Sequence, residues 1–278
     1  MTDEHMDKKL NAHHHARLER VLLSMLAVVL LYTLLAYLLL PALWTHYEHQ
    51  KGLADLPMVT RTAQGIPGDP IDVGLIGNEK EVLCAMNAAG WLPADPVTFK
   101  SSIEIAGSVL LDRAYPEAPV SPLYYLGRRE DLAFEKPSGR SADRRHHVRF
   151  WKVLDKGQEN RPVWLGSDTF DRGVGVSHFT GAITHHIDAD LDTERDMLAG
   201  DLETAGMVTA KYQVTGVGLT LTGRNGGGDP YFTDGEVWVL RLVEDCERRT
   251  GPVDVIPSPP ATELKDQILR SITDALKS

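Results

Sequence analysis

The sequence is poor in cysteine and in positive charge. Its 278 residues include 2 cysteines, Cys84 and Cys246, whose spacing has no signature, so a disulfide and two reduced thiols both stay open. The 29 Lys and Arg residues are outnumbered by 39 Asp and Glu residues, which gives a formal net charge of −10. An acidic chain is poorly suited to neutralise phosphates, which argues against nucleic-acid binding.

Several catalytic motifs are also missing. The sequence has no nucleophile elbow, no phosphate-binding lysine loop, no His-Glu-x-x-His and no pair of catalytic carboxylates. With 42% hydrophobic and 24% charged residues, the composition is that of a globular protein rather than a disordered or fibrous one. The length allows one or two domains.

One long apolar run is present. Residues 21–44 contain no charged residue and no glycine. As a helix that rises about 1.5 Å per residue, the run spans roughly 36 Å, which exceeds a hydrocarbon core of about 30 Å. A cleaved signal peptide has a shorter apolar core followed by small residues at a cleavage site, and neither is found here. The run therefore predicts a retained transmembrane helix over 21–44.

Basic residues near the ends of the run predict its orientation. Four Lys or Arg residues precede it, whereas only Lys51 and Arg61 fall within the 20 residues after it. By the positive-inside rule, residues 1–20 form a cytoplasmic tail and the rest of the chain is periplasmic or extracytoplasmic. The expected localisation is the cell membrane, as a single-pass protein.

The chain after the run divides into three parts. Residues 45–68 are expected to form a juxtamembrane connector, 69–248 a folded domain, and 249–278 a Pro-rich linker with a short amphipathic helix. Mixed strand and helix patterns predict an α+β fold, with a mixed or mainly antiparallel sheet and two or three helices.

Local patterns predict the individual elements. Residues 71–76 indicate a buried strand, and Asn78 with Glu81 forms a capping-box variant that begins a helix closed by Gly90. Asp192 and Thr193 can cap a second helix that ends at Gly206. The apolar residues of 99–111 fit both the spacing of a helix face and the alternation of a strand, and the length of the segment favours a helix. The remaining strands are expected at 123–126, 132–134, 146–153, 162–170 and 174–187, as an antiparallel meander, and at 208–221 and 237–243, around a glycine-rich hairpin loop at 224–230.

Many sequence blocks occur in one order between Gly68 and about Gly206. They are GDPI at 68–71, GWLPADP at 90–96, GSVLLDR at 107–113, PVSPLY at 119–124, GRREDLAF at 127–134, RHHVRFW at 145–151, TFDRGVG at 169–175 and ITHHI at 183–187. In these blocks the chain resembles the LssY-like C-terminal domain family. The resemblance implies a membrane-anchored, extracytoplasmic module of unassigned biochemistry, and it brings no catalytic residues with it.

Arginines and histidines gather in the middle of this acidic domain. Guanidinium groups pair well with phosphate and carboxylate groups, so the cluster is the candidate ligand-binding face. It comprises Arg128, Arg129, Arg145, His146, His147, Arg149, Arg172, His178, His185 and His186. In the alternative interpretation, the arginines pair with acidic residues nearby, as exposed charges usually do.

The histidines permit a second interpretation. Adjacent residues of a strand point to opposite faces, so each His-His pair offers only one member to a shared site. His178, His186 and one of His146 or His147 would form a three-imidazole zinc set if their strands pair, with His185 on an apolar face. Because no metal motif accompanies them, the sequence predicts neither a metal nor a cofactor.

The expected function is that of a membrane-anchored accessory or binding module near envelope lipid or cell-wall metabolism, with phosphate-bearing or other anionic ligands. The expected partners are the membrane through residues 21–44, an anionic lipid or envelope polymer, and a membrane protein. The alternative is a phosphoester hydrolase that uses the His cluster, with or without a metal.

Overall fold

The computed structural model describes residues 3–40, 42, 50, 52–53, 56–94, 122–139, 144–213 and 221–258, and the scattered residues 260, 262–264, 266–268 and 271. The chain divides into two compact units, Met1–Glu48 and His49–Ser278.

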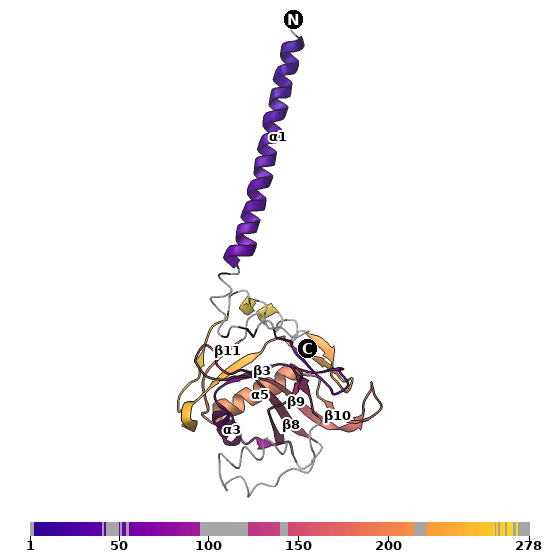
Figure 1. Cartoon of the computed structure of the whole chain (residues 1–278), viewed down its shortest axis with the longest axis vertical. Helices are drawn as coiled ribbons and strands as arrows, with labels where there is room; N and C mark the ends of the chain where they lie inside the picture. Colours follow the sequence, from indigo (N-terminus) through magenta and orange to yellow (C-terminus); the bar gives the residue numbers. More distant parts are fainter. Residues whose placement is uncertain are drawn as a thin grey trace. The chain divides into compact units, whose positions relative to one another are not determined.

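The N-terminal unit is one long helix (Figure 1). α1 (Asp3–Leu34) continues into a π-helical turn, η1 (Leu35–Leu39). Its stretch Arg17–Leu39 contains an 18-residue window with a mean hydropathy of 2.5 and is long enough to cross a membrane. The hydroxyls of Ser24 and Thr33 donate to carbonyls one turn earlier, so neither polar group is left unpaired in an apolar surrounding. The predicted membrane helix is thus confirmed as a helix of suitable length and composition.

The second unit is built on a mixed sheet whose main path runs β15-β11-β14-β3-β9-β8-β7-β4, with β10 paired to β9. The pairs β14·β3 and β11·β15 are parallel and the others are antiparallel, as the α+β prediction requires. The strands are β3 (Val73–Ile76), β4 (Leu92–Pro93), β7 (Leu132–Pro137), β8 (Arg145–Leu154), β9 (Val163–Val176), β10 (Ile183–Ile187), β11 (Val208–Gln213), β14 (Trp238–Leu242) and β15 (Asp254–Val255).

Two smaller sheets accompany the main one. The first has the order β2-β1-β5-β6 and the second is the hairpin β12-β13. Arg224 pairs with Pro230 in this hairpin, so the expected turn at the glycine run is confirmed. The strands are β1 (Val59–Arg61), β2 (Pro67–Pro70), β5 (Tyr124–Tyr125), β6 (Arg128–Arg129), β12 (Thr222–Arg224) and β13 (Pro230–Phe232).

Two helices, α3 (Glu79–Ala88) and α5 (Leu191–Thr204), cover one face of the main sheet (Figure 1). The capping box predicted for α3 is present: Asn78 Oδ1 accepts from Glu81 N, and Glu81 accepts from Asn78 N. α5 is capped two residues before the expected Asp192, because the side chain of Asp190 accepts from Thr193 N.

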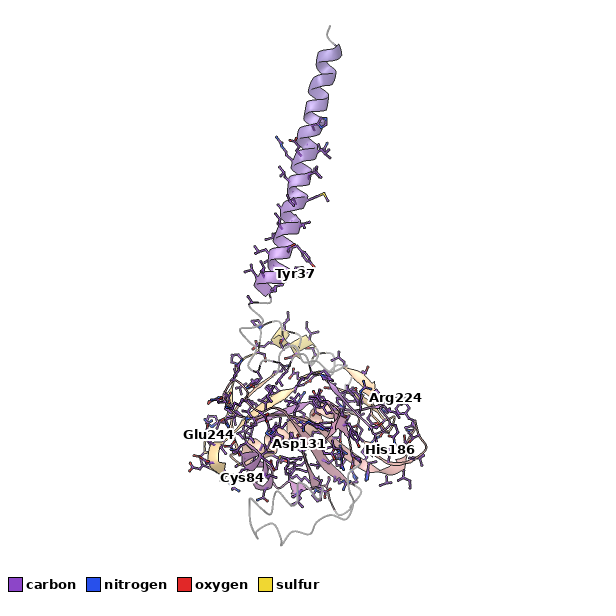
Figure 2. The ribbon with its side chains drawn as sticks, viewed as in Figure 1. Tyr37, Cys84, Asp131, His186, Arg224 and Glu244 are labelled. Carbon is purple, nitrogen blue, oxygen red and sulfur yellow. A yellow bond between two sulfur atoms is a disulfide. The ribbon has the colours of Figure 1, made fainter. Side chains whose placement is uncertain are left out.

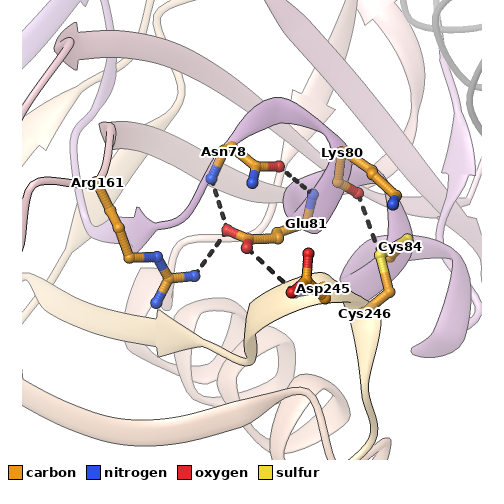
Figure 3. Close-up of a disulfide and its surroundings, with 7 residues drawn as sticks. All are labelled: Asn78, Lys80, Glu81, Cys84, Arg161, Asp245 and Cys246. Carbon is orange, nitrogen blue, oxygen red and sulfur yellow. Dashed lines mark hydrogen bonds and ion pairs between the residues drawn. A yellow bond between two sulfur atoms is a disulfide. The ribbon is translucent and has the colours of Figure 1, made fainter.

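A disulfide between Cys84 and Cys246 joins α3 to the short 3₁₀ helix η3 (Glu244–Cys246), with the two Cα atoms 5.8 Å apart. Figure 3 shows why these segments meet: the Glu81 carboxylate accepts from Arg161 Nη2 and from the backbone N–H of Asp245. The sequence left both a disulfide and two reduced thiols open, and the structure has the disulfide.

Each face of the main sheet has its own core, because side chains alternate along β8 and β9. Phe150 and Trp164 pack with α3 and α5 on one face. Trp151 and Leu165 pack on the other, with Leu53 and Tyr125. Odd-numbered positions of these strands therefore face the second core, and this alternation decides where each histidine of β8 lies.

Three boundaries differ from those expected. The folded unit includes Leu53, which is fully buried, and β1, both before residue 69, and β15 extends the sheet beyond residue 248. β9 runs unbroken through Gly173 to Val176, so the segment 174–187 is a hairpin rather than one strand. The helix predicted over 99–111 lies outside the described residues, as does the end of the C-terminal helix.

Candidate functional site

A pocket of about 390 Å³ opens on the second face of the sheet. Its walls come from the turn after β1, the β9–β10 hairpin and the glycine loop between β12 and β13. Its charged lining consists of Asp69, His147, Arg149, Asp171 and His185. Four of these five are buried, so a ligand that reaches the floor meets charges in a largely water-free surrounding.

His147 lies at the centre of the floor, 3% exposed. Its Nε2 is 2.8 Å from Arg149 Nη1 and 3.0 Å from Thr169 Oγ1, and its Nδ1 is 3.2 Å from Asp171 Oδ2. Arg149 only donates hydrogen bonds, so Nε2 is the acceptor and the Nδ1 proton faces Asp171. The strand pairing of β8 with β9 thus fixes both the position and the tautomer of this ring.

Several cationic or imidazole groups surround the carboxylate of Asp171. Besides His147, Arg145 Nε lies 3.3 Å and His185 Nδ1 3.5 Å from its Oδ2. Burial alone would raise the pKa of this carboxyl, but the neighbouring His147, His185 and Arg149 lower it to about 2. Asp171 is therefore a firmly ionised anchor that orients cations toward the pocket.

Asp69 behaves in the opposite way. It follows Gly68 on β2 and lies 3.6 Å from Arg149 Nη1, which is an ion-pair distance rather than a hydrogen bond. Burial raises the pKa of Asp69, although Arg149 and His147 act against the rise. The charge of Arg149 is thus less firmly compensated by Asp69 than that of Arg145, which bonds Glu135 at 2.8 Å as well as Asp171.

A second group of side chains lies beside the pocket. His186 Nδ1 is 2.7 Å and His178 Nε2 3.9 Å from Asp229 Oδ1. His185 and His186 are neighbours on β10 but contact different carboxylates, Asp171 and Asp229, as alternation along a strand requires. In the view of Figure 2, His186 lies on the side of the domain that carries Arg224, away from Cys84 and Glu244.

The structure divides the ten candidate residues among several places. His147, Arg149 and His185 line the pocket, Arg145 lies against Asp171 of its floor, and His178 and His186 meet beside it. His146 lies on the helix-covered face, where its Nδ1 is 2.6 Å from Glu194 Oε2. Arg172 is exposed on β9.

The two remaining arginines pair with acidic neighbours. Arg128 bonds Asp131, and Arg129 bonds Glu130 at 2.9 Å, so the pairing interpretation holds for both. The expected apolar setting of His185 was wrong, because its segment turns at 177–182 and strand parity does not pass through a turn.

Sequence reasoning missed two acidic residues of this region, Asp69 and Asp229. Each stands between a glycine and a proline, in Gly68-Asp69-Pro70 and Gly228-Asp229-Pro230. The glycine before and the proline after set the backbone conformation around one acidic side chain. This Gly-Asp-Pro pattern is the sequence feature by which both residues could have been found. Asp69 and Asp229 come close to β8 and β10 through the pairing of strands distant in the sequence, which local patterns do not show.

The fold and the pocket together define a mixed α+β domain with a buried polar site, on a chain with one candidate membrane helix. Residues 53–237 match the family model described as LssY C-terminus, so the chain belongs to this family. No curated protein and no solved structure matches the chain. The match begins at Leu53, in agreement with the burial of that residue.

Proposed function

We propose that this protein is a membrane-anchored, extracytoplasmic binding module whose pocket takes a small anionic group, a phosphate or a carboxylate. The observation that carries the proposal is the placement of Arg149, His147 and His185 around one 390 Å³ pocket, on a floor organised by Asp171. An anion above this floor would accept hydrogen bonds from the Arg149 guanidinium, with His147 and His185 beside it, and charge-assisted bonds of this kind are among the stronger ones.

The raised pKa of Asp69 supports this choice of ligand. A carboxyl with a raised pKa takes up a proton more readily than Asp171 does, and its loss of charge favours an incoming anion beside Arg149. Gly226 and Gly227 of the glycine loop line the same pocket.

The extracytoplasmic placement rests on two supports. Four basic residues precede the membrane run and two follow it, and the domain contains a disulfide between its only cysteines. Disulfides form and persist mainly in oxidising compartments. An active periplasmic reporter fused after residue 278 is the expected result, and a reporter active only in the cytoplasm would contradict the placement.

Ligand binding is tested on the full chain in detergent micelles. Thermal unfolding is followed with inorganic phosphate, and separately with micelles doped with phosphatidic acid or with phosphatidylcholine. A ligand at 100 times its Kd adds about 2.7 kcal/mol, which raises the unfolding midpoint by several degrees. A rise with phosphate and phosphatidic acid indicates a free phosphate group as the shared chemistry, and a rise with phosphatidic acid alone indicates a lipid headgroup.

Matched variants locate the site. His185→Gln and Arg149→Lys are expected to abolish the rise, whereas Arg172→Ala, on the same strand system but exposed, is expected to keep it. The proposal fails if neither ligand shifts the midpoint of the native chain, or if Arg172→Ala has the same effect as His185→Gln.

A second candidate function, hydrolysis of phosphate esters, is favoured by the contact between His186 and Asp229. A carboxylate 2.7 Å from Nδ1 orients an imidazole for general acid or base work. Turnover of a panel of phosphomonoesters and phosphodiesters, lost in His186→Gln, would support it. No turnover by the native chain would exclude it.

A further inference from the structure

Two segments far apart in the sequence, the β9–β10 hairpin and the loop between β12 and β13, bring His178, His186 and Asp229 together. His178 comes from the β9–β10 turn, His186 from β10, and Asp229 from the loop between β12 and β13. Each offers one ligand atom, and these atoms all lie within 4.8 Å of one another. Among the described residues, this group includes neither His146 nor His147, which are the histidines that the sequence suggested as third ligand.

We propose that His178, His186 and Asp229 bind one divalent transition-metal ion, of which Zn²⁺ is the representative. Two imidazoles and one carboxylate suit zinc, iron or manganese, whereas calcium and magnesium take mainly oxygen ligands. Two zinc ligands at about 2.0–2.1 Å lie about 3.3 Å apart when they are arranged tetrahedrally. The two nitrogen–oxygen distances of this group, 2.7 and 3.9 Å, bracket that value.

The carboxylate is held in place by its surroundings. Asp229 is 3% exposed, and its Oδ2 accepts from the backbone N–H of Ile187 at 3.1 Å. The side chain of Asn225 accepts from the backbone N–H of Asp229 at 2.8 Å and from that of Gly227 at 3.0 Å. Asp229 Oδ1 is therefore aimed at the two imidazoles before any ion arrives, which is the support that metal ligands usually receive from their neighbours.

Two glycines make room for the imidazoles. A Cβ at Gly175 would lie 2.3 Å from His186 Nε2, and a Cβ at Gly228 would lie 2.6 Å from His178 Cβ. Gly228 also has φ +91°, a conformation that other residues rarely adopt. The backbone N–H of His178 donates to Gly227 O at 2.8 Å, which fastens the β9–β10 turn to the glycine loop.

An ion at this position would take the place of the hydrogen bond between His186 and Asp229, and would tie the turn to the loop. Three protein ligands leave a fourth position open, as in catalytic rather than structural zinc sites. His178 is 60% exposed, so this open position is accessible from solvent. Ser177 and His185, next in sequence to His178 and His186, line the anion pocket, as does Gly227, two residues before Asp229. The metal site does not depend on anion binding in that pocket.

The test uses the full chain in detergent, purified without a histidine tag and with His13, His14 and His15 replaced by Gln, because a run of three histidines also binds zinc. After treatment with a chelator, Zn²⁺ is titrated by calorimetry, and Co²⁺ is titrated by its visible absorption. One equivalent of metal and a tetrahedral cobalt spectrum are expected. Release of a proton on binding is expected as well.

Variants separate a built site from adventitious binding. His186→Gln and Asp229→Asn are expected to raise the Kd for Zn²⁺ more than about 100-fold, since even the loss of an outer-shell partner costs about 10–100-fold. His178→Gln alters an exposed turn residue, so it keeps the test valid if the other two variants fail to fold. Phe179→Ala, next to His178 in the same exposed turn, is the control and is expected to bind as the native chain does.

Three outcomes would overturn the proposal. They are no stoichiometric binding by the native chain, an unchanged Kd in a folded His178→Gln or His186→Gln variant, and an equal loss in Phe179→Ala. Binding of Zn²⁺ without any response to phosphate would contradict the proposed anion pocket and leave the metal site standing.

Discussion

At the scale of single residues, the charge balance of the pocket depends on Asp171, which is 1% exposed and lies between Arg145, His147 and His185. The sequence predicted that only one histidine of each adjacent pair reaches a shared site, and this holds for His147 and His146. It did not predict which one, because that depends on which face of β8 is covered by α3 and α5. The choice follows from packing between elements distant in the sequence.

The first prediction concerns Asp171. Its pKa in the folded chain is lowered to about 2 from 3.8, so its contribution to stability is present above about pH 4 and is lost as the pH falls toward 2. Asp171→Asn is expected to cost about 2–3 kcal/mol at pH 7, since each pKa unit corresponds to about 1.4 kcal/mol. The difference from the native chain should shrink as the pH falls.

Thermal unfolding of the full chain in detergent at several pH values measures this effect. Asp254→Asn, at an exposed carboxylate of the edge strand β15, is the control and should leave the stability unchanged. A constant difference between Asp171→Asn and the native chain from pH 7 down to pH 2 would contradict the assignment.

The second prediction has the opposite sign. Burial and the neighbouring Asp72 raise the pKa of Asp168 well above 3.8, and neither carboxylate oxygen of Asp168 has a hydrogen-bond partner in the described part of the chain. The folded chain keeps a proton that the unfolded chain releases above about pH 4, so stability falls as the pH rises from 4 through the folded pKa.

Asp168→Asn cannot titrate, so it is expected to flatten this fall. Its unfolding midpoint should rise relative to the native chain between pH 4 and 8, by about 2–4 °C for each kcal/mol recovered. Asp155→Asn, at an exposed turn, serves as the control. Parallel pH profiles for Asp168→Asn and the native chain would show that Asp168 does not carry the effect.

At the scale of elements, local signals predicted what local forces determine. The capping box of Asn78 and Glu81, the helix end at Gly90 and the glycine hairpin were all recoverable, because each depends on residues a few positions apart. The hairpin of β9 and β10 was not, since Gly173 looked like a strand end and is instead a paired position within β9. The pocket was not predicted for the same reason, because it lies between that hairpin and the glycine loop.

The third prediction concerns the link between α3 and η3. The Cys84–Cys246 disulfide joins residues 162 positions apart, and constraining a loop of that length stabilises a fold by about 3–5 kcal/mol on chain-entropy arguments. The double variant Cys84→Ala with Cys246→Ala should therefore unfold at a markedly lower temperature. Adding a reductant should lower the midpoint of the native chain toward that of the variant and leave the variant unchanged. Equal midpoints for the oxidised chain and the variant would contradict the role of the bridge.

At the scale of the whole molecule, the family and the class of fold could be predicted from the sequence, whereas the strand order could not. Sequence blocks at 68–71 and 145–151 identify the family without stating which strands pair. The parallel pair β14·β3 joins strands more than 160 residues apart, and no local pattern encodes it. Residues 53–67 were assigned to a connector because glycines and prolines at 65–70 indicated a break before the domain, whereas Leu53 and Thr60 of β1 are buried.

The last prediction joins the membrane helix to the disulfide. If the four-to-two bias of basic residues directs the N-terminus to the cytoplasm, the domain reaches an oxidising compartment and its two cysteines form their bridge there. The test variant replaces Lys8, Lys9, Arg17 and Arg20 by Gln and adds Glu48→Lys and Asp55→Lys after the run. It then has no Lys or Arg before the run and four within the 20 residues after it. This variant is expected to invert and to carry reduced thiols.

Alkylation of thiols in acid-quenched cells, with and without prior reduction, gives the readout. In the native chain, Cys84 and Cys246 should react only after reduction, and in the recharged variant they should react without it. A control with equal numbers of charge changes at exposed positions of the domain, such as Lys152→Gln and Asp155→Lys, should keep the bridge. Reduced thiols in the native chain would place the domain in the cytoplasm, and a bridge that persists in the recharged variant would show that other features than these basic residues set the orientation.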